Sequence, residues 1–488
     1  MMINIRHIIA VAVAAAALTT AHADGVNSII PQPKSVTEGR GEFVIGDGTS
    51  VSCADASLRD MARYLSESIG AAVAEKGGNI TLAINPAVQR GGYEMSITPG
   101  RIDIRAAQRD GIAAAIATLR QMKRDGRIEA ASIKDEPRFA WRGFMLDVSR
   151  HFFTKEEVKS VIDSIALYKF NKFHWHLTDD EGWRVQINKY PLLTEKGAWR
   201  HKNHLDRMCD SLYSATKNDA MLVPADRLKT DGDTLYGGYY TAADIREVVA
   251  FARARGIDVI PEVDMPGHCL SAVSNYDGIS CFEQTGWGET FTSPMCPGKD
   301  KTLEMCRDIY REIFRLFPYG YVHIGGDEVE KINWEKCPDC QKRIKDNGLK
   351  DEKELQSWFN DQMEEFFRAN GKKMIGWDET ADGRLSATST IMWWRNWSKP
   401  SLDKALRNGN EVIICPMFPM YLSQPSGKNT PEAIDRFDPL SDEYSTAPKD
   451  RVLGIQTCVW TERVPSYERL MQLMFPQLRN VAEKAWNK

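Results

Sequence analysis

From about residue 139 onward, short apolar segments alternate with longer amphipathic ones. The short segments have the length of strands, and the longer ones carry apolar residues at helical spacing. Parallel strands need long crossovers, so this alternation predicts a parallel sheet of βα units. We expect strands at 142–148, 171–177, 257–263, 320–326, 373–377, 390–394, 411–416 and 452–460, and helices at 155–169, 242–255, 302–317, 352–370, 401–408 and 466–485. Eight strands favour a closed (β/α)8 barrel of the α/β class.

A smaller domain is expected before the barrel. Residues 24–137 combine short alternating stretches with Ala-rich helical stretches at 58–74 and 111–123, which is typical of a small α+β domain. The barrel then occupies 138–488, and an insertion at about 185–240 is expected to be a surface loop near its active face. The alternative is an open doubly wound sheet, which is less favoured because no Gly-rich phosphate turn follows the first strand.

Residues 1–23 have the pattern of a secretory signal peptide. A short basic stretch precedes an apolar run from Ile8 to Leu18, and Ala21-His22-Ala23 is a small-x-small cleavage pattern. The run is shorter than the roughly 20 residues that a membrane span needs. We therefore expect a protein that is exported to the periplasm or the extracellular space, begins near Asp24 and does not insert into the membrane.

The charge balance argues against nucleic acid as a partner. The chain has 63 Lys and Arg residues against 67 Asp and Glu residues, which leaves a formal net charge of −4. Proteins that bind nucleic acid or membrane surfaces usually show a basic excess or basic tracts.

The ten cysteines include one CxxC element, Cys337-Pro338-Asp339-Cys340. Such an element is either a redox motif or half of a zinc site. A redox motif would need a thioredoxin-like context and a zinc site would need a second pair, and the sequence shows neither. A local disulfide or two unpaired thiols is the favoured interpretation, and the pairing of the ten cysteines stays open.

The predicted strands end in residues whose side chains can transfer protons or bind a ligand. In a barrel of this kind the active site lies at the carboxyl ends of the strands. These ends hold Asp147 to His151, His174 to Asp180, Pro261 to His268, His323 to Glu328, Gly376 to Glu379, Met392 to Arg395, Pro416 to Tyr421 and Val459 to Glu462. Carboxylates beside tryptophans indicate acid–base chemistry next to flat apolar faces, which is how sugars are held. No GxxxxGK[ST] motif is present to bind phosphates.

A catalytic metal is the weaker alternative. His174 and His176 lie on one face of a strand, as metal-binding pairs do. A barrel metal site of this type also needs histidines from later strands, and His323 is the last histidine of the chain. We expect no metal and no organic cofactor, and we expect His174 and His176 to support neighbouring carboxylates.

Asp327-Glu328 is the sharpest single motif. Two glycines precede it, which lets the backbone bend or a ligand approach closely. For Asp327 alone, a helix N-cap is the competing interpretation. Adjacent strand residues point to opposite faces, so the two carboxyls are not expected to flank one bond as nucleophile and acid. We expect them to divide their roles between leaving group and another part of the substrate.

These motifs resemble those of glycoside hydrolase family 20, the β-N-acetylhexosaminidases. Similar strings are Ile30 to Lys34 at the start of the small domain, Arg142 to Arg150, His176 to Arg184, Pro261 to His268 and His323 to Glu328, in that order. The resemblance covers nearly the whole chain after the signal peptide. It implies retaining hydrolysis in which the 2-acetamido oxygen of the substrate attacks the anomeric carbon and forms an oxazolinium ion.

The resemblance also implies a role for each matching residue. Glu328 would be the general acid and then the base, Asp327 would orient the acetamide, and Tyr421 would hydrogen-bond the acetamide oxygen. Trp377, Trp393 and Trp460 would form the aromatic walls, with Trp394 as a further candidate, Arg150 and Glu462 would bind sugar hydroxyls, and Asp180 and His268 would support the acid with Glu262 nearby.

One position departs from the family pattern. Many members have Tyr-Leu-Asp on the seventh strand, where this chain has Tyr421-Leu422-Ser423. The missing carboxylate puts one contact to the far sugar hydroxyls in doubt and leaves the preference for GlcNAc or GalNAc open.

The expected partner is a glycan with a terminal N-acetylhexosamine, and a homodimer is left open. Two alternatives remain. One is a glycosidase with a covalent carboxylate nucleophile, Asp180 or Glu262. The other is a catalytically silent sugar-binding protein.

Overall fold

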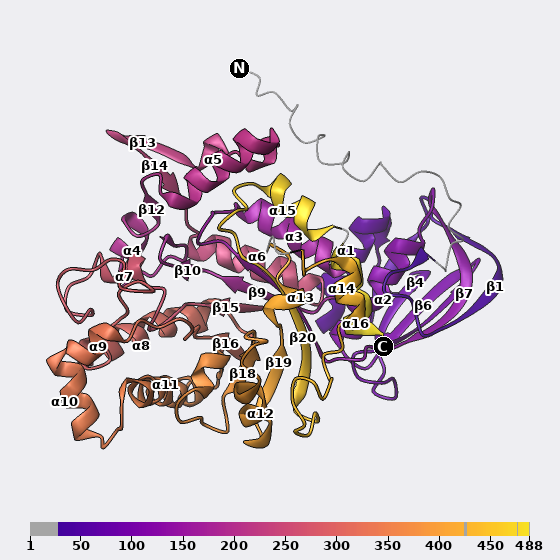
Figure 1. Ribbon diagram of the computed structural model, residues 1–488. Helices are drawn as coiled ribbons and strands as arrows, with labels where there is room; N and C mark the ends of the chain where they lie inside the picture. The colour runs from indigo at the N-terminus through magenta and orange to yellow at the C-terminus, as the bar shows by residue number, and fades with distance from the viewer. Residues whose placement is uncertain (1–27, 424–426, 476, 488) are drawn as a thin grey trace.

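The computed structural model describes residues 28–423, 427–475 and 477–487. The predicted signal peptide therefore lies outside the described residues. The described part forms two domains that lie side by side (Figure 1). Within it, no helix is both long and apolar enough to cross a membrane.

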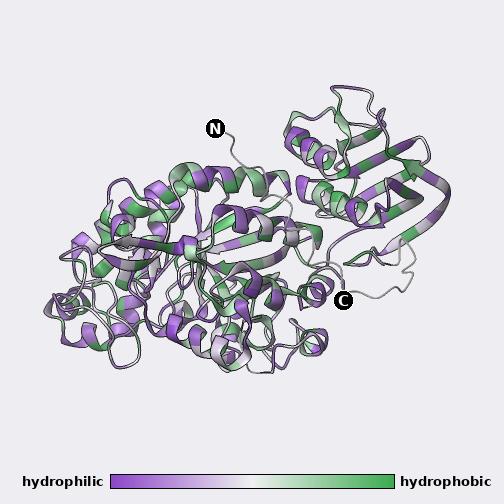
Figure 2. Ribbon diagram, turned by 90° about the horizontal axis from the view of Figure 1, so that it is seen from above, coloured by the Kyte–Doolittle hydropathy of each residue, from purple (hydrophilic) through white to green (hydrophobic). Residues whose placement is uncertain are grey.

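The small domain is a seven-stranded sheet with two helices. Its strands, in the order β1-β7-β5-β6-β4-β2-β3, are β1 (Ser35–Val44), β2 (Ser50–Cys53), β3 (Ala72–Val73), β4 (Ile80–Ile84), β5 (Tyr93–Thr98), β6 (Arg101–Ala106) and β7 (Arg127–Asp135). The helices α1 (Arg59–Ile69) and α2 (Arg109–Met122) bury their apolar side chains against this sheet. Hydrophobic and hydrophilic residues alternate along the strands (Figure 2), as expected for a sheet with one buried face.

The second domain is a closed parallel barrel. Its strands are β8 (Trp141–Asp147), β9 (Lys172–His176), β15 (Asp258–Glu262), β16 (Tyr321–His323), β17 (Lys373–Trp377), β18 (Thr390–Trp393), β19 (Glu411–Ile414) and β20 (Val452–Val459). The main outer helices are α3 (Lys155–Leu167), α6 (Ala242–Ala254), α8 (Asp300–Leu316), α11 (Glu352–Ala369), α12 (Lys399–Arg407), α14 (Pro431–Arg436), α15 (Tyr467–Met474) and α16 (Gln477–Trp486). The predicted (β/α)8 fold is confirmed.

Local sequence explains where the outer helices begin. At the start of α3, the side chain of Thr154 accepts the backbone N–H of Glu157, and the side chain of Glu157 accepts the backbone N–H of Thr154. This reciprocal cap satisfies two backbone donors that a helix start would otherwise leave unpaired. Thr241 and Asp244 form the same arrangement at the start of α6.

Apolar side chains of the barrel strands divide between two cores. The larger core lies between strands and helices and includes Trp175 and Trp393, whereas the barrel interior includes Met145, Ile260 and Met392. Neighbouring residues such as Met392 and Trp393 fall in different cores because successive side chains of a strand point to opposite faces.

Three sequence expectations need correction. The helix expected at 466–485 is two helices, and α15 ends before Phe475, which precedes Pro476, because a residue before proline is disfavoured in helical conformation. The insertion at 185–240 is ordered: it contains α4 (Leu192–Glu195), α5 (His204–Thr216) and the sheet of β12 (Trp199–Arg200), β14 (Asp233–Gly237) and β13 (Leu228–Asp231). Finally, Cys337 and Cys340 are not an isolated pair, because Cys281 and Cys296 lie beside them.

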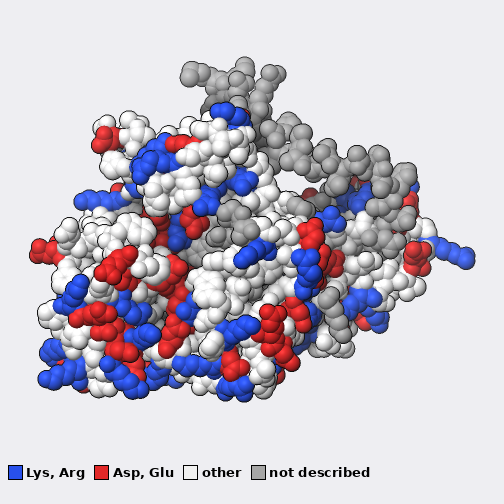
Figure 3. Space-filling model, viewed as in Figure 1, with Lys and Arg blue, Asp and Glu red and all other residues white. Residues whose placement is uncertain are grey.

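The remaining short elements lie in the loops at the carboxyl ends of the strands. Besides short 3-10 helices, they are β10 (Thr178–Asp179), β11 (Gly182–Trp183), α7 (Leu270–Val273), α9 (Ile332–Lys336), α10 (Pro338–Asp346) and α13 (Met417–Met420). On the face shown in Figure 3, basic and acidic residues are interspersed.

Candidate active site

A cavity of about 90 Å³ lies at the carboxyl ends of the barrel strands. Segments that end or follow β8, β16, β17, β18, β19 and β20 line it. The lining residues are Arg150, Asp327, Glu328, Trp377, Trp394, Met417, Tyr421, Trp460 and Glu462. The structure therefore brings together most of the side chains that the sequence singled out for direct contact with a substrate.

Aromatic rings form the walls of this cavity. The rings of Trp394 and Tyr421 are stacked, with centroids 6.2 Å apart and planes 11° from parallel. Trp460 lies against both Tyr421 and Trp377, with centroid distances of 6.0 and 5.8 Å. Flat, largely buried ring faces of this kind suit the apolar face of a sugar ring.

Trp393 does not reach the cavity, contrary to its predicted place in the walls. It is fully buried between the strands and the outer helices, where its ring packs against Tyr444 at 5.3 Å. Its indole N–H donates to the backbone carbonyl of Ser398. Trp394 takes the position in the wall because side chains alternate along β18 and the residue that follows it.

The turn after β16 aims both predicted catalytic carboxyls into the cavity. Gly325, Gly326 and Glu328 all have positive φ angles, of 74°, 91° and 48°. β16 ends at His323, so Asp327 and Glu328 do not follow strand geometry. The expectation that their side chains point to opposite faces is wrong for this reason: both line the same cavity.

Asp264, which follows the neighbouring strand β15, fixes this turn. Its Oδ1 accepts the backbone N–H of Gly326 at 3.0 Å. A Cβ atom on Gly325 would lie 1.9 Å from the same oxygen, so only glycine fits there. Burial raises the pKa of Asp264 to about 7. Burial also raises the pKa of Asp327 well above its ordinary value, and the neighbouring Asp264 carboxyl adds to that rise.

His268 links two pairs of acidic side chains. Its Nδ1 lies 3.2 Å from Asp179 Oδ1 and 3.4 Å from Asp180 Oδ2, and its Nε2 lies 3.4 Å from Glu328 Oε2 and 3.7 Å from Asp327 Oδ2. Burial opposes the imidazolium, but Asp179 first, and then Asp180 and Asp327, raise the pKa of His268 well above its ordinary value. A charged imidazolium therefore stands directly behind the two carboxyls.

Arg150 stands on another side of the cavity among carboxylates. Its Nη2 lies 2.7 Å from Asp179 Oδ2, its Nε lies 3.4 Å from Glu181 Oε2, and its guanidinium lies over the ring of Trp460. Burial raises the pKa of Glu462, and Arg150 opposes that rise. Asp179, Glu181 and Asp264 were not singled out from the sequence, although Asp179 and Asp264 lie in strand ends that were and Glu181 directly follows one of them.

The insertion buttresses Arg150. Arg200 donates to the backbone carbonyl of Arg150 at 3.2 Å and is ion-paired with Asp206 at the start of α5. The hydroxyl of Tyr236 on β14 accepts the backbone N–H of Phe152. The insertion thus supports one rim of the cavity.

Glu262 lies beneath the cavity and does not line it. Its fully buried carboxylate lies within 3.0 Å of ring nitrogens of His174, His176 and His323, and it accepts the indole N–H of Trp377 at 2.7 Å. His174, Glu262 and His323 could hold a metal ion by proximity, as could Asp179, Asp180 and His268. In the arrangement described, the three imidazoles support the carboxylate that positions Trp377.

Asp180 is also engaged outside the cavity. Its Oδ1 accepts the backbone N–H of Leu270 at 3.0 Å and the hydroxyl of Thr292 at 2.7 Å.

Ser423, at the position that departs from the family pattern, uses its hydroxyl to accept the backbone N–H of Trp460 at 3.0 Å. It therefore holds a wall of the cavity in place.

A second cavity of about 310 Å³ adjoins the first. Both are lined by Glu328 and Trp394, and the larger one adds Phe291, Lys331, Arg395 and Trp397. The side chain of Glu328 thus stands at the boundary between the two cavities.

Comparisons with known proteins agree with this architecture. The sequence model "Glycosyl hydrolase family 20, catalytic domain" matches residues 139–488, and "Glycosyl hydrolase family 20, domain 2" matches residues 26–136. A beta-hexosaminidase of Porphyromonas gingivalis is 35% identical over 95% of this chain, which spans 60% of that protein's length. A beta-hexosaminidase of Vibrio furnissii is 34% identical over 93% of this chain and 76% of its own.

Solved structures agree as well. An exo beta-N-acetylglucosaminidase from Vibrio harveyi, in complex with N-acetylglucosamine, superposes with a TM-score of 0.81 at 32% identity, covering 94% of this chain and 73% of that one. A beta-N-acetylhexosaminidase from Bacteroides fragilis gives a TM-score of 0.80 at 27% identity, covering 94% and 91%. With both domain types matched in order, the chain belongs to glycosyl hydrolase family 20.

Proposed function

We propose that the protein is an exo-acting β-N-acetylhexosaminidase that removes terminal non-reducing β-linked GlcNAc or GalNAc from glycans with retention of configuration. The observation that carries this proposal is the position of Glu328 at the boundary between the two cavities. A sugar in the small, aromatic-walled cavity would direct its glycosidic bond toward the larger one. The Glu328 carboxyl would then lie beside the oxygen of that bond.

The attacking atom belongs to the substrate in this proposal. The acetamide oxygen attacks the anomeric carbon, the glycosidic C–O bond breaks, and Glu328 donates a proton to the leaving oxygen. Glu328 then takes a proton from water as the water oxygen attacks the anomeric carbon. The oxazoline ring opens, the acetamide is restored, and the two inversions together retain the configuration.

Asp327 and Tyr421 aim the acetamide. The Asp327 carboxylate would accept the acetamide N–H, and the Tyr421 hydroxyl would donate to the acetamide oxygen. The pKa of Asp327 is raised in the free site mainly by burial. Positive charge that develops on the oxazolinium nitrogen favours the ionised carboxylate, so the interaction strengthens as the reaction proceeds.

The geometry disfavours a covalent carboxylate nucleophile at the two candidate positions. Neither Glu262 nor Asp180 lines the small cavity. Each carboxylate is already held by other groups of the protein: Glu262 by the three imidazoles and the indole N–H of Trp377, and Asp180 by Leu270 and Thr292.

A substrate panel tests the proposal. Aryl β-glycosides of GlcNAc and GalNAc should be hydrolysed, and the matching plain β-glucoside should be a far poorer substrate because it lacks the attacking oxygen. A thiazoline analogue of the intermediate should inhibit strongly. Equal rates on the plain glucoside, or no thiazoline inhibition, would favour a protein nucleophile. Glycan binding without sugar release would favour a silent binding protein.

We further propose that the larger cavity holds the next residue of the glycan. Trp397 lines it, with a side chain that is 60% exposed and an edge against Trp394 at 5.2 Å. Trp397→Ala should raise KM for a chitooligosaccharide several-fold while leaving KM for the methyl β-glycoside of GlcNAc nearly unchanged, because a sugar ring can stack on the exposed indole and a methyl group cannot. Equal effects on both substrates would argue against this placement.

We propose export for the protein as a whole, on the signal-peptide pattern of residues 1–23. Expression of the full chain in a bacterial host tests this. The intact mass of the fraction outside the cytoplasm should correspond to a chain that begins near Asp24, and retention of the full-length chain in the cytoplasm would contradict it.

A further inference from the structure

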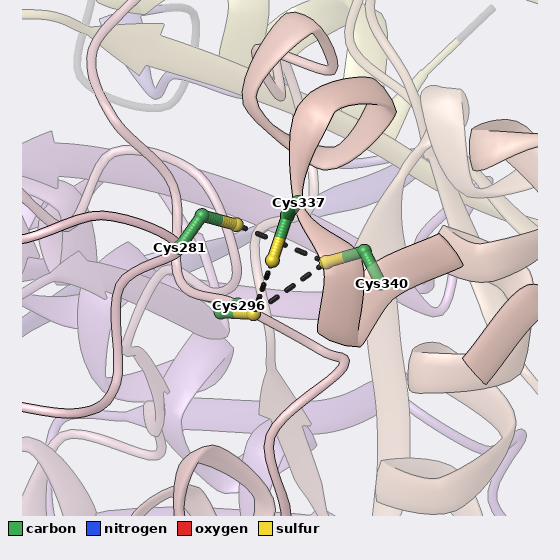
Figure 4. A group of neighbouring side chains, drawn as sticks. All are labelled: Cys281, Cys296, Cys337 and Cys340. Atoms are coloured by element: carbon green, nitrogen blue, oxygen red, sulfur yellow. Dashed lines mark hydrogen bonds between the residues drawn. The ribbon is translucent and has the colours of Figure 1, made fainter. Parts of the chain in front are cut away.

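Four cysteine side chains meet outside the active site, from two separate parts of the chain (Figure 4). Cys281 and Cys296 lie in the long loop between α7 and α8, and Cys337 and Cys340 flank the start of α10. All four Sγ atoms lie within 4.8 Å of one another. Spacing did not reveal the first pair because fourteen residues separate its members.

The sulfur positions form one cluster. Cys296 Sγ lies 3.7 Å from Cys337 Sγ and 3.5 Å from Cys340 Sγ, and Cys340 Sγ lies 3.8 Å from Cys281 Sγ. A tetrahedron of sulfurs about a zinc ion has edges of roughly 3.8 Å, given Zn–S bonds of about 2.3 Å. The sulfurs of Cys296 and Cys340 each approach two others, which fits a shared central ion better than two separate disulfides.

The surroundings of the cluster suggest a structural role. Cys296, Cys337 and Cys340 are buried with Val329, Trp334 and Leu355 in a small apolar cluster that is separate from the main core, and Cys281 is half-buried. α9 and α10 are short, and the loop that carries the first pair has little regular structure. A metal ion bound by these four side chains would add a cross-link between the two loops where regular structure adds little.

We propose that Cys281, Cys296, Cys337 and Cys340 bind one Zn²⁺ ion in a closed tetrahedral site. Four protein ligands leave no position open for water or substrate, so the role is structural. The proposal does not depend on the glycosidase activity proposed above.

The site would join the two loops that form one rim of the active site. The loop of Cys281 and Cys296 contains Phe291, which lines the larger cavity, and Thr292, which donates to Asp180. The segment of Cys337 follows Glu328 closely. Glu330 already ties the two together by accepting the backbone N–H groups of Thr290 and Phe291. A zinc ion would fix this connection.

Disulfides are the competing outcome, because an exported protein meets an oxidising compartment. Metal analysis and thiol chemistry on the purified full chain separate the two. We expect about one zinc ion per chain, released when p-hydroxymercuribenzoate titrates the thiols and detected with a metallochromic indicator. The denatured, unreduced protein should still show all ten cysteines as free thiols. Metal-free protein with fewer thiols, or iron in place of zinc, would overturn the proposal.

Cobalt substitution tests the ligand set directly. Co²⁺-loaded protein should show the intense visible absorption of tetrahedral thiolate coordination, and Cys281→Ser should weaken and shift it. Cys53→Ser, which replaces another half-buried free cysteine in the small domain, should leave both spectrum and zinc content unchanged. If Cys281→Ser does not fold, the wild-type metal content and thiol count still decide the question. An unchanged cobalt spectrum in Cys281→Ser would exclude that residue as a ligand.

Discussion

Glu328 and His268 share an unusual backbone conformation. Both have φ angles near +47°, at +48° and +46°, which non-glycine residues rarely adopt. Their side chains meet, with His268 Nε2 3.4 Å from Glu328 Oε2. Conformations of this kind cost energy and persist where the surrounding structure enforces them, commonly at functional sites. The backbone is therefore strained at the residue proposed as the acid and at the histidine that contacts it.

Glu328→Gln tests the proposed acid. The amide keeps the size of the side chain but cannot donate the proton, so kcat for an aryl N-acetyl-β-glucosaminide should fall by at least about 10²-fold. Glu335→Gln, at an exposed position on α9, should leave kcat unchanged. A loss smaller than tenfold, with the circular dichroism spectrum retained, would mean that another residue is the acid.

Asp264 should make stability depend on pH. Its pKa rises from an ordinary value of 3.8 to about 7 on folding, because the carboxyl is buried. Below pH 3.8 the carboxyl is protonated in both the folded and the unfolded chain. Between that value and about pH 7 the folded chain keeps a proton that the unfolded chain releases, so this contribution to stability is lost as pH rises through that window.

Asp264→Asn should remove that dependence. Asparagine can still accept the N–H of Gly326, and it carries no charge to be buried. Urea unfolding should be measured at pH 5 and at pH 8. Over this range the free energy of unfolding of the wild type should fall by about 1 kcal/mol more than that of the variant. Asp258→Asn, a partly exposed position on β15, the strand that precedes Asp264, is the control. Parallel pH profiles for wild type and Asp264→Asn would refute the assignment.

At the scale of elements, the turn after β16 is the part on which the site depends most. Gly325→Ala would place a Cβ 1.9 Å from Asp264 Oδ1 at a φ of +74°. The turn must shift to relieve this contact, and it carries both Asp327 and Glu328. A displacement of about 1 Å at such a site can cost 10²-fold in rate, so kcat/KM should fall by about that factor.

Gly371→Ala is the matched control for this prediction. Gly371 has a similar φ of +71°, but no atom lies within 4 Å of its added Cβ. It should cost about 1 kcal/mol of stability through backbone strain alone and leave kcat/KM unchanged. If Gly325→Ala behaved like Gly371→Ala, the clash with Asp264 would not control the turn.

The strands and helices could be located from sequence to within a few residues, because periodicity and caps are local properties. β17, for example, covers Lys373–Trp377 as expected. The side-chain directions after the strands could not be located in the same way. Trp394 rather than Trp393 faces the cavity because side chains alternate there, and the composition of that strand end does not show which of the two points inward. Asp327 and Glu328 face the cavity together because the chain leaves strand geometry after β16.

At the scale of the whole molecule, a buried ion pair joins the two domains. Lys169, which follows α3, and Asp135, at the end of β7, lie 2.7 Å apart with no exposed side-chain surface. Asp135 also accepts the indole N–H of Trp486 in the last helix, which lies between the domains in Figure 1. Burial lowers the pKa of Lys169, and Asp135 opposes that shift. The barrel and the small domain are therefore expected to unfold together.

Lys169→Met tests this coupling. It would leave the Asp135 carboxylate buried without its counter-ion, which typically costs about 3–5 kcal/mol. The free energy of unfolding from urea titration should fall by that order. Lys155→Met, which removes a partly exposed pair with Asp244, should cost less than about 1 kcal/mol. Two separate unfolding transitions in the wild type would contradict the coupling.

The sequence by itself determined the barrel, the small domain before it and the set of chemical groups at the strand ends, because alternation, helical spacing and local motifs record these directly. Only the tertiary structure decided which of those groups meet. It placed Asp264 against the turn after β16, turned Trp393 away from the cavity, and brought Cys281 and Cys296 to Cys337 and Cys340. Contacts between residues far apart in the chain depend on how several loops pack at once, and no local pattern encodes that packing.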